Sequence, residues 1–179
     1  MTHDSLRSFI DALKAKGDLH EINQPLDPHL EITEVSRRLL EQDGPALLFN
    51  KPKSGELPVI TNLFASQRRI AAGLGLEEVS QLREFGELLA SLKDPQPPRK
   101  LREIWGKVPL FRRALSMAPR QVKRADCYAV SFEADDVDLT RLPIQTCWPE
   151  DAGPLITWGL VITKNPETGR HNLGVYRYR

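Results

Sequence analysis

A cluster of three prolines in "DPQPP", residues 94–98, divides the chain into two parts of different character. Proline fixes φ, removes a backbone donor and restricts the residue before it, so neither a helix nor a central strand continues through such a stretch. Before the cluster, apolar residues recur mostly with helical spacing; after about Cys127 they run together as in strands. The cluster therefore predicts a linker between a mixed α/β block and a β-rich block.

Helices alternate with short strands in the N-terminal block. The first helix has apolar residues at i, i+3, i+4 and i+7 from Leu6, with Asp4 or Ser5 as N-cap and Gly17 as its end. The second is expected to begin with Asp27 as N-cap and Pro28 at the first helical position. Ser66 is expected to cap a third helix that ends at Gly73, and a fourth helix is expected at about 77–92. Strands are expected within 19–26, 46–49 and 58–64.

Strands dominate the prediction for the C-terminal block. "CYAVSF" (127–132) and "LITWGLVIT" (155–163) are rich in β-branched and aromatic residues, and "KNPETGR" (164–170) supplies a turn before "HNLGVYRYR" (171–179). An isolated two-stranded hairpin is marginal in water. We therefore expect that more polypeptide follows this hairpin in the parent protein.

Composition narrows the class of protein. Apolar residues make up 40% of the 179 residues and charged residues 27%, with a net charge of +1, as in an ordinary globular protein. The N-terminus has no apolar signal-peptide core, and no apolar run approaches the ~20 residues of a membrane span. The two cysteines, Cys127 and Cys147, form no CxxC pattern. A cytoplasmic location is expected.

The end of the chain groups residues that suit a phosphorylated cofactor. Asn172 offers an amide oxygen for a hard cation, Arg177 a planar fork for phosphate or carboxylate, and Gly174 a close approach to the backbone. Asn172 and Arg177 are five positions apart, so a regular strand points them to opposite faces. They serve one ligand only if the strand is bulged or the ligand wraps its end. The alternative is an exposed hairpin arm without a ligand.

Three other segments have both a functional and a structural interpretation. In "TCWPEDAGP" (146–154), Glu150 and Asp151 lie near Trp148 and are candidates for an acid of raised pKa, or simply part of a rigid turn. "EADDVDL" (133–139) is interpreted as a turn or cap. The segment 99–124 holds nine Lys or Arg residues and one acid, and suits an anionic surface or a solvated helix face.

Several strings together resemble one family. "DPHLEITEVSRRLLEQDGPALLF", "NLF" at 62–64 and "LPIQTCWPEDAGPLITWGLVITKNPETGRHNLGVYR" are similar to the N-terminal part of UbiD-type decarboxylases. Within that family the likeness is to the enzymes that decarboxylate 4-hydroxy-3-polyprenylbenzoate in ubiquinone biosynthesis. The resemblance covers essentially all 179 residues.

The resemblance implies an α/β (α+β) fold class. An N-terminal mixed α/β domain (1–93) is followed by a Pro-rich linker and basic helical connector (94–126), and then by the first strands of a split β-barrel flavin-binding domain (127–179). Family members are well over twice as long as this chain. The resemblance therefore implies a carboxy-lyase whose N-terminal part is seen here, inactive on its own.

The cofactors implied by the resemblance are prenylated FMN and Mn²⁺, with K⁺ alongside. Asn172 matches the metal-binding Asn of the family, and Val175, Tyr176 and Arg177 match residues that contact the flavin. Arg177 also matches the catalytic Arg that orients the substrate carboxylate and a proton-donating Glu. The other metal ligands and the catalytic glutamates would lie beyond Arg179.

The expected partners follow from the same resemblance. They are an aromatic acid with a polyprenyl tail, a flavin prenyltransferase that supplies the cofactor, and further copies of the protein in a homo-oligomer. The basic 99–124 segment makes an anionic membrane surface, at the inner face of the cell membrane, a candidate partner, whereas no nucleic acid is expected. The alternative function is a non-enzymatic α/β module that uses 99–124 to bind anionic lipid or nucleic acid.

Overall fold

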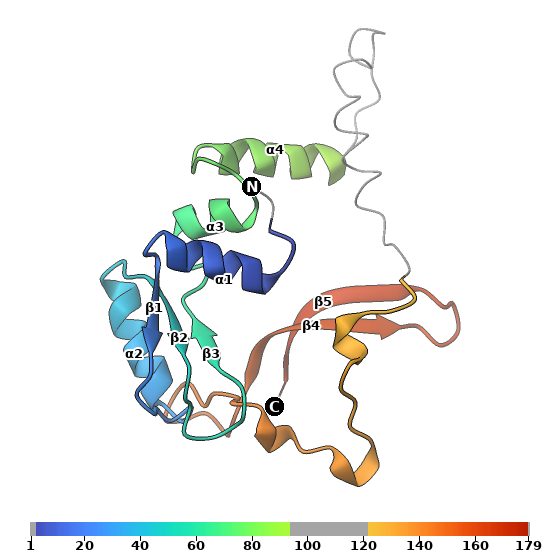
Figure 1. Ribbon diagram of the computed structural model, residues 1–179. Helices are drawn as coiled ribbons and strands as arrows, with labels where there is room; N and C mark the ends of the chain where they lie inside the picture. Colours follow the sequence, from blue (N-terminus) through green and yellow to red (C-terminus); the bar gives the residue numbers. More distant parts are fainter. Residues whose placement is uncertain (1–2, 94–121, 179) are drawn as a thin grey trace, which may run out of the picture. The chain divides into compact units, whose positions relative to one another are not determined.

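The computed structural model describes residues 3–93 and 122–178 (Figure 1). The chain divides into two compact units. One comprises Met1–Val79 and Asp138–Arg179, and the other comprises Ser80–Val137. Helices and two small sheets make up the described residues, as the α/β (α+β) fold class predicts.

A three-stranded sheet organises the first unit. Its strands are β1 (Leu19–Ile22), β2 (Ala46–Phe49) and β3 (Val59–Thr61), in that order across the sheet. The β1 and β2 strands are parallel, and α2 (Glu31–Glu41) lies between them in the chain, because a parallel pair needs a crossover. The β3 strand then pairs antiparallel with β2.

The core lies on both faces of β2. Ala46 belongs to one cluster, with Phe9 and Leu13 of α1 (Leu6–Ala15), whereas Leu47 belongs to a second cluster with Ile32 of α2. Consecutive residues of a strand point to opposite faces, so β2 is covered by α1 on one side and α2 on the other. This accounts for the unbroken apolar run of the strand.

The starts and ends of two helices confirm the sequence prediction. The Ser5 hydroxyl accepts a hydrogen bond from the Ser8 amide at 3.2 Å, forming a capping box at α1, and Gly17 adopts φ 70° just after the helix. Ser66 likewise caps α3 (Gln67–Gly73) by accepting from the Arg69 amide. Local capping chemistry therefore determines these boundaries.

The predicted start of α2 is wrong. The helix begins at Glu31, and Leu30 before it adopts φ 67° with no side-chain cap. The backbone of Pro28 accepts from the Thr146 amide at 3.2 Å, and the Leu30 amide donates to the Thr146 carbonyl at 3.0 Å. The Pro28 carbonyl and the Leu30 amide are thus bonded to a distant segment, and only the Leu30 carbonyl joins the helix, where it accepts from the Glu34 amide at 2.9 Å.

The second unit holds α4 (Gln81–Lys93), which begins later than the predicted residue 77. The predicted strand at 127–132 is wrong. The short 3-10 helix η1 (Asp126–Tyr128) covers its start, and no described strand pairs with the rest. The apolar side chains of Tyr128, Val130 and Phe132 are exposed, so β-propensity alone did not place this segment in a sheet.

A β-hairpin ends the described chain. Its arms are β4 (Ile156–Lys164) and β5 (His171–Tyr178), which form a separate two-stranded antiparallel sheet (Figure 1). Asn165 forms the turn, where its side-chain oxygen accepts from the amides of Glu167 and Thr168, and Gly169 takes φ 68°. Two short 3-10 helices, η2 (Ala134–Asp136) and η3 (Leu139–Arg141), precede the hairpin.

Candidate functional site

All four sequence-predicted site residues lie on β5. Asn172 is paired with Thr163 of β4, Val175 with Leu160, and Tyr176 with Gly159. Their side chains are exposed on the hairpin. One strand therefore presents the residues expected to bind metal, cofactor and substrate.

Asn172 and Tyr176 share one face of β5. The Asn172 amide nitrogen lies 3.4 Å from the Tyr176 hydroxyl oxygen. Residues two and four apart on a strand face the same side, so Gly174 lies between them on this face. This contact places the tyrosine hydroxyl beside the amide nitrogen of Asn172.

Gly174 makes room for the tyrosine ring. A Cβ added at this position would lie 2.5 Å from Cε2 of Tyr176, far inside van der Waals contact. The ring therefore folds back over the glycine toward Asn172. The space that the sequence suggested for a ligand at Gly174 is taken by this ring in the structure.

Arg177 lies on the opposite face of β5 from Asn172, together with Val175. A β-bulge is present, but it lies in β4: Ile156 pairs with Tyr178 and Gly159 with Tyr176, which leaves two residues of β4 opposite Arg177. The extra residue is on the partner strand, so the alternation along β5 is unchanged. The structure does not bring the Asn172 and Arg177 side chains together on one face.

The bulge places Thr157 and Trp158 opposite Arg177. Trp158 in turn contacts Phe64 of the N-terminal block, with ring centroids 5.7 Å apart. The sequence analysis gave neither of these aromatic residues a role. The "NLF" string at 62–64 could have drawn attention to Phe64, since the string was noted for its family resemblance and was given no role.

The structural interpretation holds for the segment 146–154. The Trp148 amide donates to the Asp151 carboxylate at 2.9 Å, and the Asp151 amide donates back to the Trp148 carbonyl at 3.1 Å. Glu150 is exposed. These contacts close a tight turn in which the aspartate is a cap, and nothing buries either acid beside the tryptophan.

The interpretation of 133–139 as a turn or cap is also confirmed. Asp138 caps η3, where its carboxylate accepts from the Thr140 hydroxyl at 2.6 Å and from the Thr140 amide at 2.8 Å. These hydrogen bonds, that of the hydroxyl first, lower the pKa of Asp138 below its ordinary value. Of the basic segment, residues 99–121 lie outside the described residues.

A complete metal site is not present within 3–93 and 122–178. No three His, Cys, Asp or Glu side chains gather there in a way that could hold a metal ion. None of the helices in the same ranges has the length and apolarity of a membrane span.

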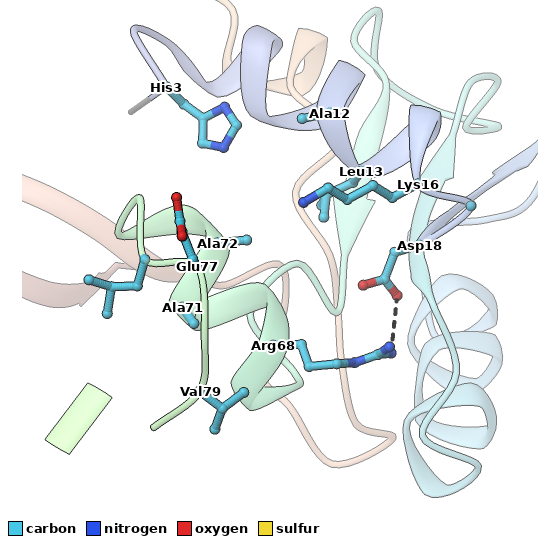
Figure 2. Close-up of a pocket in the computed structure, with 12 residues that line it drawn as sticks. His3, Ala12, Leu13, Lys16, Asp18, Arg68, Ala71, Ala72, Glu77 and Val79 are labelled. Carbon is cyan, nitrogen blue, oxygen red and sulfur yellow. Dashed lines mark ion pairs between the residues drawn. The ribbon is translucent and has the colours of Figure 1, made fainter. Parts of the chain in front are cut away.

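A cavity of about 670 Å³ lies elsewhere, between α1 and α3 (Figure 2). It is lined by charges of both signs, and at one end Arg68 reaches toward Asp18 with a separation of 3.8 Å. No β5 residue lines it. Opposite charges that neutralise each other leave little field for a ligand, so this cavity is not the candidate site.

Comparison with protein families gives two matches along the chain. Residues 10–89 match the 3-octaprenyl-4-hydroxybenzoate carboxy-lyase N-terminal domain. Residues 120–179 match the 3-octaprenyl-4-hydroxybenzoate carboxy-lyase Rift-related domain, so the hairpin and all four site residues belong to this second match. Together the two matches cover most of the chain.

Solved structures of related enzymes agree with these matches. Vanillic acid decarboxylase from Sedimentibacter hydroxybenzoicus, in its closed form, is 26% identical with a TM-score of 0.75, over 99% of this chain and 35% of that one. The 3,4-dihydroxybenzoic acid decarboxylase from Enterobacter cloacae is 28% identical with a TM-score of 0.73, over the same shares.

A third structure contains a cofactor. An evolved dimeric form of the UbiD-class enzyme HmfF from Pelotomaculum thermopropionicum, in complex with prFMN, is 26% identical with a TM-score of 0.67, over 98% of this chain and 35% of that one. The chain thus spans about a third of the length of these enzymes. It belongs to the UbiD family of carboxy-lyases, with residues 10–89 matching their N-terminal domain and residues 120–179 their Rift-related domain.

Proposed function

We propose that this chain is the N-terminal part of a decarboxylase that uses prenylated FMN and acts on 4-hydroxy-3-polyprenylbenzoate in ubiquinone biosynthesis. Both matching family models are named for a 3-octaprenyl-4-hydroxybenzoate carboxy-lyase, which supports this substrate class. The observation that carries the proposal is β5, a strand of the Rift-related match that bears Asn172 and Arg177. By itself, this part of the protein is expected to be inactive.

The Asn172 face of β5 fits a cation-bound phosphate. The amide nitrogen is held near the Tyr176 hydroxyl, so the amide oxygen, a hard ligand of the kind that Mn²⁺ or K⁺ accepts, is free to point away from the strand. The described residues supply no cluster of further ligands. Asn172 would therefore supply one ligand of a metal site, and the other ligands would come from elsewhere in the parent protein.

The Arg177 face fits a carboxylate. Its guanidinium is exposed, always charged and planar, and it can bind a carboxylate through two parallel hydrogen bonds. We infer that Arg177 orients the substrate carboxylate, while the backbone of Val175 and Tyr176 contacts the flavin. Asn172 and Arg177 then serve different groups, which is consistent with their opposite faces.

Decarboxylation of an aromatic acid demands such a site. Loss of CO₂ leaves an electron pair on a ring carbon, and prenylated FMN, when bound, supplies the electron sink that stabilises it. Arg177 holds the carboxylate in one orientation, so that the scissile bond stays aligned. Its charge also favours the carboxylate over the neutral acid.

The test uses the parent protein at full length, reconstituted with prenylated FMN and Mn²⁺. We expect CO₂ release from 4-hydroxy-3-polyprenylbenzoate, at a higher kcat/KM than from vanillic acid or 3,4-dihydroxybenzoic acid. Arg177→Lys should lower kcat/KM about 100-fold, because a point charge replaces the planar fork. Arg170→Lys, in the turn of the same hairpin, is the matched control and should change it less than about twofold.

Two results would contradict the proposal. One is a protein that turns over the two smaller acids and leaves the polyprenyl acid untouched, which would assign another substrate. The other is equal activity of Arg177→Lys and Arg170→Lys, which would remove Arg177 from the site. Retention of flavin and manganese in Asn172→Ala would separately remove Asn172 as a metal ligand.

The partners are part of the same proposal. A flavin prenyltransferase would supply the cofactor, and the parent protein would assemble as a homo-oligomer, as the dimeric HmfF structure suggests. A substrate with a polyprenyl tail is held in the membrane. We therefore propose a cytoplasmic protein that works at the inner face of the membrane, with the basic 99–124 segment near anionic lipid.

A further inference from the structure

An apolar groove of about 470 Å³ lies in the first unit, beside the hairpin. We call it the Phe64 groove. It is lined by apolar side chains from three distant parts of the chain, namely Leu6, Ile60, Leu63, Phe64 and Trp158. The start of α1, the end of β3 and the bulge of β4 meet there.

The two polar lining residues turn their polar groups away from the groove. The Thr61 hydroxyl lies 2.7 Å from the Ser36 hydroxyl of α2, and the Asn62 amide donates to the Ser36 carbonyl at 2.7 Å. Asn62 reaches this partner from φ 55°, a conformation that asparagine tolerates better than most residues. The surface left to a ligand is therefore almost entirely hydrocarbon.

The aromatic wall of the groove is held in place from behind. Phe64 stacks on buried Phe9 with centroids 5.8 Å apart and an interplanar angle of 13°. A Cβ at Gly73 of α3 would lie 2.9 Å from Cε1 of Phe64, so a glycine is needed where the ring passes. Trp158 then packs against Phe64 at a tilt of 53°.

One wall of the groove, Trp158, belongs to the part of β4 that lies opposite Arg177. Trp158 is one of the two bulge residues of β4 at this point. A residue that lines the hydrocarbon groove thus lies across the hairpin from the residue expected to hold a carboxylate. This combination suits an amphipathic anion, with a carboxylate at one end and a long apolar chain at the other.

We propose that the Phe64 groove binds the polyprenyl tail of an aromatic acid whose carboxylate is held at Arg177. This inference rests on the proposed function and adds to it the residues that distinguish a tailed acid from a tail-less one. Burial of each additional CH₂ favours binding, so the groove selects for the tail. Leu6, Phe64 and Trp158 are the specificity-determining side chains.

The test measures binding to the parent protein loaded with FMN in place of prenylated FMN, so that the probes bind without being decarboxylated. Isothermal titration is done with 4-hydroxy-3-geranylbenzoate and tail-less 4-hydroxybenzoate as probes. The wild-type protein should bind the geranyl acid at least about tenfold more tightly. Leu6→Glu places a charge in the groove, and it should reduce this preference to about twofold or less. Leu6 is 54% exposed and begins α1, where an acidic residue suits the helix dipole, so the fold should be kept.

Leu57→Glu is the matched control, because Leu57 is 52% exposed and does not line the groove. It should leave the preference unchanged. Ala65→Phe, which fills the groove with a ring, should also abolish the preference and serves if Leu6→Glu unfolds. Equal binding of both probes by the wild-type protein, or an intact preference in both groove variants, overturns the inference. Binding is read without turnover, so loss of decarboxylation alone would instead count against the proposed function.

Discussion

At the scale of single residues, a buried arginine joins three segments of the N-terminal block. Arg69 of α3 is 2% exposed. Its Nη1 donates to the Asp18 carboxylate at 2.9 Å and its Nη2 to the Gly44 carbonyl at 3.2 Å, while its Nε has no partner. Asp18 precedes β1 and Gly44 follows α2. A charge this deep is stable only while its partners stay in place.

Arg69→Ala should therefore destabilise the protein by roughly 3–5 kcal/mol, because Asp18 loses its partner inside the fold. Arg68→Ala is a sharp control, since Arg68 is 72% exposed and lies 3.8 Å from the same aspartate. It should cost less than about 1 kcal/mol. Urea unfolding, monitored by circular dichroism, compares the free energies of unfolding of the two variants. Equal losses of stability would show that the buried ion pair contributes no more than the exposed one.

At the scale of elements, α2 has a charge cluster on its exposed side. Glu34 accepts from Arg37 Nε at 2.8 Å and from Arg38 Nε at 2.7 Å. The hydrogen bond from Arg37, then that from Arg38, lowers the pKa of Glu34 to about 2. Because the pKa is depressed in the folded state, the stabilisation is complete above the ordinary value of 4.5 and is lost as the pH falls toward 2.

Glu34→Gln should therefore destabilise the protein at pH 7, and the difference from the wild type should disappear between about pH 4.5 and 2. Thermal unfolding at a series of pH values measures it. Because the cluster is exposed, 1 M salt should shrink the difference at pH 7. A difference that persists at pH 2, or ignores salt, would mean that the glutamate acts through packing.

The elements also show what can be predicted from a sequence of this kind. Helix caps such as Ser5 and Ser66, and the hairpin turn at Asn165, were predictable or consistent with prediction because their contacts are local. The start of α2 was not, because the backbone at 28–30 bonds to Thr146, which no local pattern reveals. The prediction of a strand at 127–132 was wrong because a strand also needs a partner to pair with, and this segment has no described partner strand.

The same distinction applies to the candidate site. Strand parity correctly separated the Asn172 and Arg177 faces, because alternation is a local property of β5. The position of the bulge in β4 depends on the pairing of two strands, and the Phe64 groove depends on three segments packed together. Only the structure could show that Trp158, which lies opposite Arg177 in the hairpin, contacts Phe64.

At the scale of the whole first unit, contacts of the segment 138–146 hold its two parts, residues 1–79 and 138–179, together. The Glu56 amide donates to the Arg141 carbonyl at 2.8 Å, and the Arg141 guanidinium pairs with the Glu56 carboxylate at 2.8 Å. The two parts approach each other closely at Gly55. This residue has φ 80°, and a Cβ added there would lie 2.6 Å from the backbone nitrogen of Pro143. The backbones approach this closely only because the residue is glycine.

Gly55→Ala should therefore loosen this attachment, combining an unfavourable φ with a backbone clash, at a cost of more than about 2 kcal/mol. Gly17→Ala separates the two causes, because Gly17 has φ 70° and nothing within 4 Å of its added Cβ. It should cost about 1–2 kcal/mol. Hydrogen exchange at the Leu30 and Thr146 amides should accelerate in Gly55→Ala and not in Gly17→Ala; similar acceleration in both would remove the clash from the explanation.

The bridge between His29 and Thr146 has a consequence for biogenesis. The β1–β2–β3 sheet pairs strands that all lie within residues 19–61, whereas this bridge must bring together residues that the ribosome releases far apart in time, and the entropy of closure grows with loop length. The N-terminal sheet is therefore expected to assemble first, with the 28–30 segment left unpaired. Until Thr146 emerges, those backbone groups are an open edge on the nascent chain, available to any extended peptide that meets it.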